Sequence, residues 1–496
     1  MPRLVREVDA DPDALHALDS PRHSVVVERE VAPGVFEAER GPVEGYRRTV
    51  ERIDGAKARQ TVEYRLALPY FGPMFALAVR RHLNRVGGSH STPWWAPPET
   101  LDSTASRALG SLGLMTVMFG FMGTLLTQTI TFAAGEFGAD RGAQGLTLSA
   151  VRFDVVIALV VVTMGDKRGR RTVLLFATAA GAALTATGAL APSLGWLAAS
   201  QVLTRGFVTG GAILSGVMAA EEMPAGSRAY AISVLGLLGA LGAGICVMLL
   251  PVADLGDSTW RLLWVVPLLF LPAVAHLRQT LPESRRFRAP HPEARVAGHG
   301  KRFWLLAISA LLVAVFSTPA SQFQNEYLRT ERGFSAARMS LFTIATNTPG
   351  AIGVIVGGRL ADTRGRRGVG AIAMAGGAIA TVFMYLAAGW PLWAWSVTGA
   401  IVGAAAIPAL GVYGPELFPT SMRGMANGVI TVLGRVGSVV GLLVAGLVAN
   451  RFDTLGPAIA LLSVGPLLLA VLVLAAYPET AHIELEDINP EDRSVA

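Results

Sequence analysis

The sequence predicts an all-α membrane protein with twelve transmembrane helices in two six-helix halves, preceded by a small α+β soluble domain. Two observations lead to this prediction. Of the 496 residues, 52% are hydrophobic and only 16% are charged, whereas a soluble globular protein has about a quarter charged residues. In addition, one short charged stretch occurs twice, at 162–171 and at 358–367, each time between two apolar runs.

The repeated stretch contains an acid, a glycine and two arginines in the same order, 196 residues apart. A second pair of motifs, Pro282-Glu283-Ser284 and Pro478-Glu479-Thr480, has the same offset. Two motifs at one spacing indicate an internal duplication of six spans in the same orientation. The repeated positions are Asp166, Gly169, Arg170 and Arg171 in the first copy, and Asp362, Gly365, Arg366 and Arg367 in the second.

Residues 1–100 are polar enough to be soluble. Several β-rich runs between 24 and 67 are separated by turn sequences, and 70–86 reads as a basic amphipathic helix. Such a helix could cover the sheet or lie on an anionic membrane surface. Strands followed by a long helix resemble the end of a START-type, or polyketide-cyclase-like, domain. The segment contains no catalytic constellation, and 87–98 reads as a linker with Trp94-Trp95 placed for the membrane interface.

Each of the twelve spans is long enough to cross a bilayer, for which roughly 20 apolar residues suffice. The halves cover 105–281 and 303–480, with a central loop at 282–302 and a tail at 481–496. Glycines in the fifth and eleventh spans predict close helix contacts. The predicted spans are 106–134, 145–164, 172–192, 194–219, 229–252, 259–281, 303–325, 335–358, 369–389, 391–414, 424–449 and 455–477.

The basic residues gather in loops on one side of the predicted membrane, and this distribution accounts for the net charge of +6 without invoking nucleic acid. It predicts that both termini are cytoplasmic, in a multi-pass protein of the plasma or inner membrane. The first twenty residues have no apolar core, so no signal peptide is expected. Cys246 is the only cysteine, which excludes an internal disulfide or a cysteine-based metal site. We expect no cofactor, no metal and a monomer.

The duplicated Asp-x-x-Gly-Arg-Arg loop after spans 2 and 8 resembles the major facilitator superfamily over about 105–482. Further motifs are similar to those of its sugar-porter and organic-ion (metabolite:proton symporter) branches. They are Arg205-Gly206 with Gly210-Gly211, Pro282-Glu283-Ser284, Pro415 to Thr420 followed by Arg423-Gly424, and Pro478-Glu479-Thr480 followed by Leu485-Glu486-Asp487. The resemblance implies a secondary transporter.

Two features of the sequence depart from that family's pattern. The first copy has Val162 where the family usually has glycine, as the second copy does at Gly358, so we expect looser packing of span 2 against span 11. Proton-coupled sugar porters commonly pair an acid of span 1 with the arginine of span 4. Span 1 has no acid between Ala108 and Ala134, so symport by that pair is not expected.

The repeated motif suggests a gate. An aspartate at a helix end can accept N–H bonds from the start of a neighbouring helix, and the arginines can pair with acids at other helix ends. Contacts of this kind would form in one conformation and break in the other. The simpler alternative is membrane topology and turn formation. The candidate partners are Glu222, Arg228, Glu283, Glu416, Arg423 and Glu479.

Ionisable residues within membrane spans are costly and are therefore candidates for function. Arg205 could bind or couple the substrate, or form a structural salt bridge. Asp154 could carry a proton or pair statically with Arg152 or Arg205, and for Arg435 structural pairing is favoured. Polar residues of spans 1, 7 and 10 could contact solute or join helices. The substrate and coupling candidates are Gln128, Arg152, Asp154, Arg205, Gln322, Asn325 and Tyr413.

These observations favour a non-enzymatic transporter that moves a small organic solute through the lipid bilayer by alternating access. A proton gradient or the solute's own gradient could drive it, and proton coupling is favoured. No phosphate-binding loop is present, which argues against transport driven by ATP. Two alternatives stay open at this point. The chain could be a sensor or scaffold that no longer transports, or the first 100 residues could be a ligand-binding module tethered to the membrane.

Overall fold

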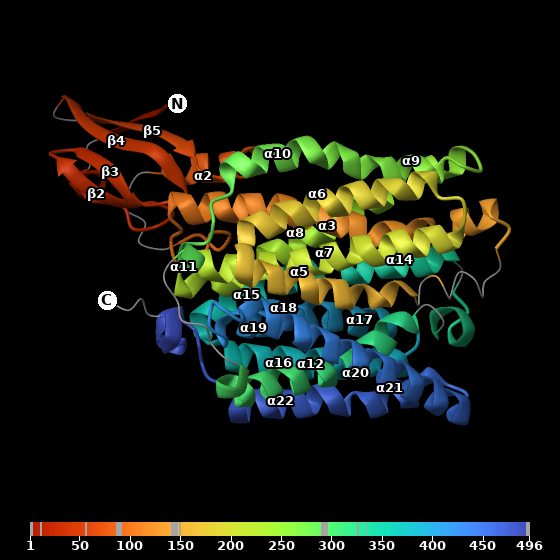
Figure 1. The fold of residues 1–496 in the computed structure, drawn as a ribbon. Coiled ribbons are helices and arrows are strands. Elements are labelled where there is room, and N and C mark those ends of the chain that lie inside the picture. The colour runs from red at the N-terminus through yellow and green to blue at the C-terminus, as the bar shows by residue number, and fades with distance from the viewer. Residues whose placement is uncertain are drawn as a thin grey trace.

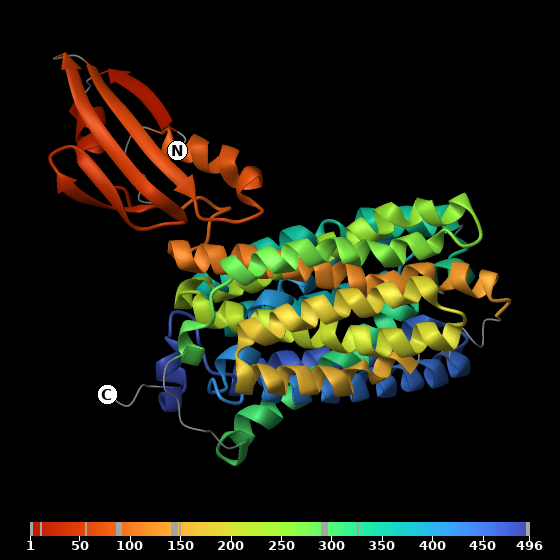
Figure 2. The ribbon, with the colours of Figure 1, turned by 45° about the horizontal axis from the view of Figure 1, so that its top comes forward.

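The structure is a computed structural model and describes residues 3–9, 12–54, 57–85, 92–139, 147, 150–288, 296–324, 327–334 and 336–492. Long α-helices run side by side in one bundle, and a small β-domain projects from one end of it (Figures 1 and 2). The predicted fold class, a helical membrane protein with a small α+β domain before it, is confirmed.

The N-terminal domain is an antiparallel five-stranded sheet with the strand order β1-β5-β4-β3-β2. Buried side chains alternate along β5, and the sheet packs its apolar face against Val79 and Leu83 of the following helix. β1 and α1 were not predicted. The elements are β1 (Arg3–Asp9), α1 (Pro12–Asp19), β2 (Val27–Ala32), β3 (Val35–Arg40), β4 (Val43–Asp54), β5 (Lys57–Leu66) and α2 (Gly72–Leu83).

The first half of the bundle follows the predicted spans. Its sixth span is broken into two α-helices around a 3₁₀ turn, where Pro267 cannot donate a backbone hydrogen bond. The elements are α3 (Ser103–Glu136), η1 (Val151–Phe153), α5 (Asp154–Arg168), α6 (Arg170–Thr187), η2 (Gly188–Leu190), α7 (Leu194–Glu222), η3 (Ala225–Ser227), α8 (Arg228–Leu249), η4 (Leu250–Leu255), α9 (Trp260–Val265), η5 (Val266–Leu269) and α10 (Phe270–Thr280).

The second half repeats this arrangement after a central segment and ends in a short folded tail. Its elements are α11 (Arg285–Arg288), η6 (Val296–His299), α12 (Gly300–Gln322), η7 (Tyr327–Glu331), α14 (Ala336–Asn347), α15 (Gly350–Arg364), α16 (Arg366–Leu386), α17 (Trp390–Ala404), α18 (Ala406–Gly411), α19 (Tyr413–Glu416), α20 (Arg423–Phe452), α21 (Leu455–Leu462), α22 (Val464–Ala476), α23 (Leu485–Ile488) and η8 (Pro490–Asp492).

Within the described parts of the chain, eleven helical segments are long and apolar enough to cross a membrane. They coincide with eleven of the twelve predicted spans. The remaining prediction, 145–164, begins in a stretch of which only isolated residues are described, and its described part consists of η1 and α5.

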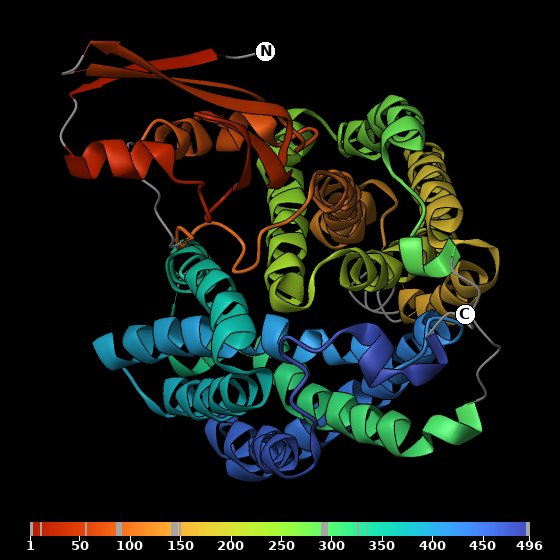
Figure 3. The same cartoon turned by 90° about the vertical axis from the view of Figure 1, so that its left-hand side faces the viewer.

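Viewed from the end that carries the β-domain, the two halves lie side by side (Figure 3). Glycines bring helices of each half into backbone contact, as predicted for spans 5 and 11. A Cβ at Gly242 of α8 would lie 1.9 Å from the carbonyl oxygen of Val117 on α3. A Cβ at Gly441 of α20 would lie 2.1 Å from the carbonyl oxygen of Val315 on α12. Larger residues at these positions would therefore force the helices apart.

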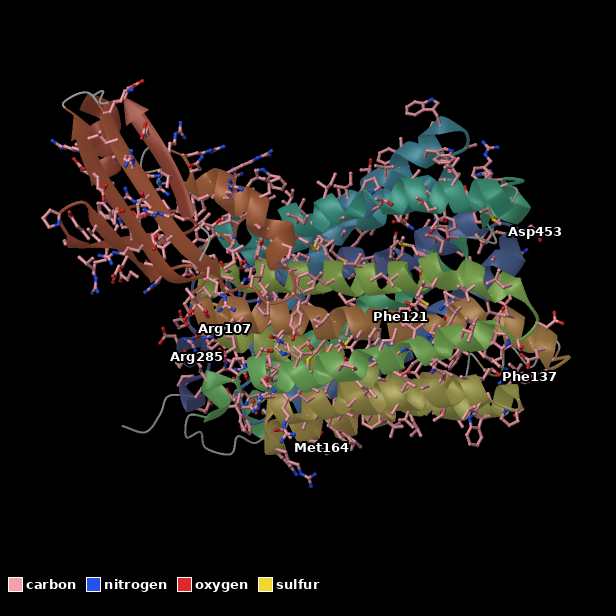
Figure 4. The ribbon with its side chains drawn as sticks, turned by 90° about the horizontal axis from the view of Figure 1, so that it is seen from above. Arg107, Phe121, Phe137, Met164, Arg285 and Asp453 are labelled. Atoms are coloured by element: carbon pink, nitrogen blue, oxygen red, sulfur yellow. The ribbon has the colours of Figure 1, made fainter. Side chains whose placement is uncertain are left out.

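The bundle has two distinct ends. Arg107 and Arg285 lie at the end next to the β-domain, and Phe137 and Asp453 lie at the opposite one (Figure 4). The residues of both Asp-x-x-Gly-Arg-Arg copies form hydrogen bonds and ion pairs at the first of these ends, which we call the motif end. At the opposite end, the ion pair between Glu136 and Arg261, at 2.7 Å, stays within the first half.

Candidate functional site

Each aspartate of the repeated motif contacts the first turn of a helix from the other half. The Asp166 carboxylate accepts hydrogen bonds from the backbone N–H groups of Gly424 (3.1 Å) and Met425 (2.7 Å), at the start of α20. Asp362 accepts from Ala229 (3.3 Å) and Tyr230 (2.9 Å), at the start of α8. Both anions thus satisfy free N–H groups and lie at the positive end of a helix dipole.

The first arginine of each motif copy is fully buried and extends these contacts. Arg170 lies 3.1 Å from Asp166 on its own half and donates to the carbonyl oxygen of Thr420 in the other half (2.5 Å). Arg366 lies 3.0 Å from Asp362 and donates to the carbonyl oxygen of Ala225 in the other half (3.1 Å). Each arginine therefore links its own motif to the opposite half.

Two buried glutamates complete the arrangement. Glu221 at the end of α7 lies 2.5 Å from Arg423 of the other half and 3.3 Å from Arg170. Glu416 lies 3.3 Å from Arg228 of the other half and also pairs with Arg366. A buried charge is tolerated only when it is paired, and here four acids meet four arginines. We call these eight residues the motif-end cluster: Asp166, Arg170, Glu221, Arg228, Asp362, Arg366, Glu416 and Arg423.

The turns that follow the motif aspartates require glycine. Gly169 and Gly365 have φ angles of +98° and +99°, which side chains with a Cβ rarely adopt. Each turn points backbone N–H groups at an acid. Glu283 accepts from Arg171 N (3.1 Å), and Glu479 accepts from Arg366 N (3.0 Å) and Arg367 N (3.2 Å).

Burial by itself would raise the pKa of Glu479. The hydrogen bonds from the N–H groups of Arg366, Ala481 and Arg367 outweigh burial and hold the pKa of this carboxyl below its ordinary value. The second arginines of the motif make local contacts instead, since Arg171 and Arg367 donate to the carbonyl oxygens of Arg278 and Leu474.

The structure places one predicted partner elsewhere. Glu222 accepts from the backbone N–H of Arg285 (2.7 Å), and its neighbour Glu221 takes the position between the motif-end arginines. Adjacent residues on a helix point about 100° apart, so only one of the two can face the other half. The sequence contains both glutamates but does not specify the helix phase that distinguishes them.

Sequence reasoning also missed the C-terminal tail. Asp492 accepts from the backbone N–H of Thr420 (2.9 Å) and lies 3.2 Å from Arg423. Asn489 donates to the carbonyl oxygen of Glu416 (2.7 Å), and Arg228 donates to that of Ile483 (2.9 Å). The tail therefore packs on the motif-end cluster and contacts residues of both halves.

A second group of charges lies between the halves, within the bundle. Asp154 at the start of α5 accepts from the hydroxyl of Thr209 (3.0 Å) and lies 3.9 Å from Arg435, in the middle of α20. Arg205, in the middle of α7, lies within electrostatic range of Asp154, Arg152 and Arg435. We call Arg152, Asp154, Arg205 and Arg435 the central cluster. The structure thus brings together the four charged residues that the sequence singled out inside the spans.

The central cluster leaves polar atoms unused. Arg205 donates to the carbonyl oxygen of Gly123 (2.7 Å) and to the hydroxyl of Thr127 (3.1 Å). Within the described part of the chain, the buried Oδ1 of Asp154 and the Nε atoms of Arg205 and Arg435 have no hydrogen-bond partner. Buried polar atoms are rarely left unpaired, so this cluster is a candidate binding site.

The other predicted substrate contacts are dispersed. Gln128 is half-buried on α3 beside Thr127, and Gln322 is exposed at the end of α12. Tyr413 is fully buried, and its hydroxyl donates to the carbonyl oxygen of Pro478 (3.0 Å), which leaves no surface open to a solute. Asn325 lies outside the described residues.

A cavity of about 620 Å³ lies within the second half. It extends between α12, α16, α18 and α20, and its few polar side chains include Ser317, Thr381 and Asn427. The remaining lining is mostly apolar, and no member of the central cluster lines it. It is therefore a separate space from the charged site between the halves.

Two duplicated six-helix halves, joined at one end by reciprocal contacts, define a membrane transport protein. The chain belongs to the Major Facilitator Superfamily, whose family model matches residues 111–395 and 305–492. The family and the relatives below are transporters and not enzymes, which confirms that prediction. The chain accordingly serves membrane transport of a small solute.

Among curated proteins, the chain is 27% identical over 426 residues to a gallate transporter of Pseudomonas putida, covering 74% of this chain and 86% of that protein. Among solved structures, it is similar to the proton:xylose symporter XylE, with 17% identity and a TM-score of 0.65. The match covers 79% of this chain and 99% of that chain. It is also similar to the human organic anion transporter MFSD10, with 16% identity and a TM-score of 0.61. That match covers 74% of this chain and 99% of that chain. At these identities the solved structures support the fold alone.

Proposed function

We propose that this chain is a secondary transporter that moves a small organic anion by alternating access, with Asp154 as the proton carrier. The observation that carries the proposal is the central cluster. It has three guanidinium groups and one carboxylate, so it has a positive charge in a place where charges are costly. An anionic solute would neutralise that excess.

The chemistry of the unused atoms favours a carboxylate over a neutral sugar. A guanidinium group presents parallel N–H donors that match the two oxygens of a carboxylate. The Nε atoms of Arg205 and Arg435 are buried and lack acceptors within the described residues. Arg205 belongs to the first half and Arg435 to the second, so one anion could contact both halves.

Asp154 has a role that depends on its protonation. As a carboxylate it attracts Arg435 across the interface between the halves (3.9 Å) and competes with a bound anion for that guanidinium. A proton on Asp154 would release Arg435 to the anion. Binding of the solute and of the proton would then favour each other, which is the condition for symport. The alternative role of Asp154, as a static partner of the arginines, predicts no such coupling.

The motif-end cluster serves as the gate in this proposal. The present structure is closed at the motif end, and the basic loops argue that this end is cytoplasmic. On this assignment, the conformation described here is the one that is closed toward the cytoplasm. Opening would require the aspartates to leave the starts of α8 and α20, as expected for contacts that distinguish two conformations. Cytoplasmic termini, a plasma or inner membrane location and a monomeric state remain predictions.

The name of one curated relative is consistent with an anionic solute. Gallate is a hydroxylated aromatic carboxylate, and the transporter named for it is the curated relative at 27% identity. We therefore place small aromatic carboxylates first among the solutes to test. The likeness to sugar:proton symporters concerns the fold and supplies no argument for a sugar.

The experiment is uptake into proteoliposomes of the full chain, with aromatic carboxylates, aliphatic organic acids, sugars and organic cations as solutes. We expect saturable uptake of a carboxylate that an inward proton gradient stimulates. Arg205→Ala should abolish binding of the anion, and Asp154→Asn should remove the stimulation by protons while it retains exchange of bound solute. Arg168→Ala, an exposed change at the motif end, is the matched control.

Three outcomes would refute the proposal. Unchanged uptake by Arg205→Ala would remove the central cluster from the binding site. A preference for neutral sugars or cations would refute the anionic substrate class. Absence of binding and uptake with every solute class would favour a sensor or scaffold that kept the fold.

A further inference from the structure

A cavity of about 320 Å³ lies between the N-terminal domain and the bundle at the motif end, in the region where the linker joins the two in Figure 2. Its walls come from three parts of the chain: Phe71 and Val79 around α2, Trp95 of the linker, and Val234 and Ile355 of α8 and α15. None of the described residues that line it carries a charge. The volume is within the range of small-molecule sites.

The opening of this cavity has the composition of a membrane-surface contact. Met74 and Trp94 line it and are each 70% exposed, and Leu77 on the same helix as Met74 is 57% exposed. Arg80 and Arg81 follow in the last turn of α2 and are exposed. Apolar side chains followed by basic ones on a short helix favour the surface of an anionic membrane, and tryptophan favours the interface.

One polar atom inside the cavity is unpaired. Ser106 lines the cavity and is fully buried, and its hydroxyl has no hydrogen-bond partner among the described residues. A ligand with an apolar body and one acceptor oxygen would satisfy this donor. The ester group at the head of a lipid acyl chain has that composition.

We propose that the cavity binds one acyl chain of an anionic phospholipid from the leaflet at the motif end, and that the bound chain stabilises the closed motif-end cluster. The lipid site depends only on the cavity and its opening. Its effect on the cluster rests on the gate role proposed above, and not on the identity of the transported solute.

The linker and Glu99, directly after it, provide the physical connection, because together they are bonded to both halves. Towards the first half, Glu99 accepts from the backbone N–H of Gly226 (2.9 Å), and Ser227 donates to the carbonyl oxygen of Glu99 (2.9 Å). Towards the second half, the guanidinium of Arg359 donates to the carbonyl oxygens of Pro93 (3.0 Å) and Ala96 (2.7 Å). The linker can make both sets of bonds only while the halves are close.

The same cavity wall contains the contact that closes the second motif. Tyr230 and Ser233 line the cavity; the N–H of Tyr230 binds Asp362, and the Ser233 hydroxyl donates to the carbonyl oxygen of Val354 across the halves (3.0 Å). The Tyr230 hydroxyl also donates to the carbonyl oxygen of Trp95 (2.8 Å). A chain packed against these residues binds the closed arrangement better than the open one, and it therefore shifts the population toward the closed state.

The first test uses the full chain in lipid nanodiscs that contain a phosphatidylglycerol with a photoreactive diazirine in its acyl chain. We expect labelling of the peptides that contain 71–79 and 94–101. Val234→Phe should fill the cavity and reduce labelling of both peptides several-fold. Val247→Phe, on the exposed face of the same helix, is the matched control and should leave the labelling unchanged.

The second test measures the distance between the two halves at the motif end. Spin labels are attached at Arg168→Cys and Arg364→Cys in a Cys246→Ala background. These two exposed positions are equivalent in the two motif copies. Replacing zwitterionic lipid by phosphatidylglycerol should increase the population with the short distance in the wild-type chain and not in Val234→Phe. Neither test requires a known solute, so a failed transport assay leaves both informative.

Equal labelling of Val234→Phe and the parent chain would overturn the site. Labelling by a free diazirine fatty acid but not by the phospholipid would overturn the proposed occupant. A lipid-dependent distance change that persists in Val234→Phe would overturn the coupling. A melting temperature of Val234→Phe close to that of Val247→Phe is the check that the variant folds.

Discussion

The two copies of the charged motif make the same contacts with different packing beneath them. In the second copy, Gly358 of α15 faces Ser233 of α8, and a Cβ at Gly358 would lie 2.0 Å from the Ser233 hydroxyl oxygen. In the first copy, Val162 of α5 takes the equivalent place and faces Gly428 of α20. A Cβ at Gly428 would lie 2.7 Å from a methyl carbon of Val162.

The larger and the smaller residue are thus exchanged between the partners. Val162 is fully buried, so the structure corrects the expectation that the first crossing is loosely packed. The comparison teaches that a close helix crossing needs one small residue in each facing pair, on either helix. A sequence motif that lies on one helix contains no information about the facing helix, so it does not predict this exchange.

The copies also differ in what covers them. The position equivalent to Arg359 in the first copy is Thr163, whose hydroxyl donates to the carbonyl oxygen of Leu159 in its own helix. Arg359 instead donates to the linker. Only the second copy, within the described residues, is therefore connected to the N-terminal domain in this way.

The largest effect should come from the glutamates that both copies share. Glu221→Gln and Glu416→Gln each remove an anion that two buried guanidinium groups share, one from each half, and breaking a buried ion pair costs about 3–5 kcal/mol. Both changes should therefore abolish the short-distance population of the spin-label pair at positions 168 and 364. Glu222→Gln is the control, because its partner Arg285 is more than half exposed. An equal effect of Glu222→Gln would contradict the assignment of Glu221.

An intermediate effect should follow from disturbing one crossing. Gly358→Val places a larger side chain against Ser233, and overpacking costs about 1–3 kcal/mol. The ratio of closed to open molecules should fall by roughly tenfold, since each 1.4 kcal/mol is about a factor of ten in an equilibrium constant. Adding Ser233→Gly recreates the Val162–Gly428 pairing and should restore closure.

The control for that pair is Gly368→Val, at a helical glycine with open space around its Cα. Failure of Ser233→Gly to rescue, with Gly368→Val unaffected, would show that the exchange of large and small residues is not what closes the crossing.

The smallest effect should come from releasing the linker. Arg359→Ala removes donors to the linker carbonyls but leaves the Asp362 contacts in place. We expect faster proteolysis at 92–100 and a loss of about 0.5–1.5 kcal/mol in domain docking, the net range of a typical hydrogen bond, because the Arg359 side chain is partly exposed. Thr163→Ala, the equivalent change in the first copy, should leave the proteolysis rate unchanged. Proteolysis that is equally slow in both variants would argue against the bridging role of the linker.

The amino-acid sequence by itself determined the membrane class, the duplication and the approximate place of each span. These features depend on composition and on spacing along the chain, and both can be read without coordinates. It also identified the motif aspartates and the four charges of the central cluster, because charged residues are rare inside apolar spans.

Only the tertiary structure decided which of these residues contact one another. Glu221 and Glu222 differ only by helix phase, and Tyr413 is excluded from the solute path only because its helix packs it against Tyr477. The contacts of Asp492 and of the linker join residues that are tens to hundreds of positions apart. Such contacts depend on the packing of whole helices, whereas the local pattern of apolar and charged residues specifies only where each helix begins and ends.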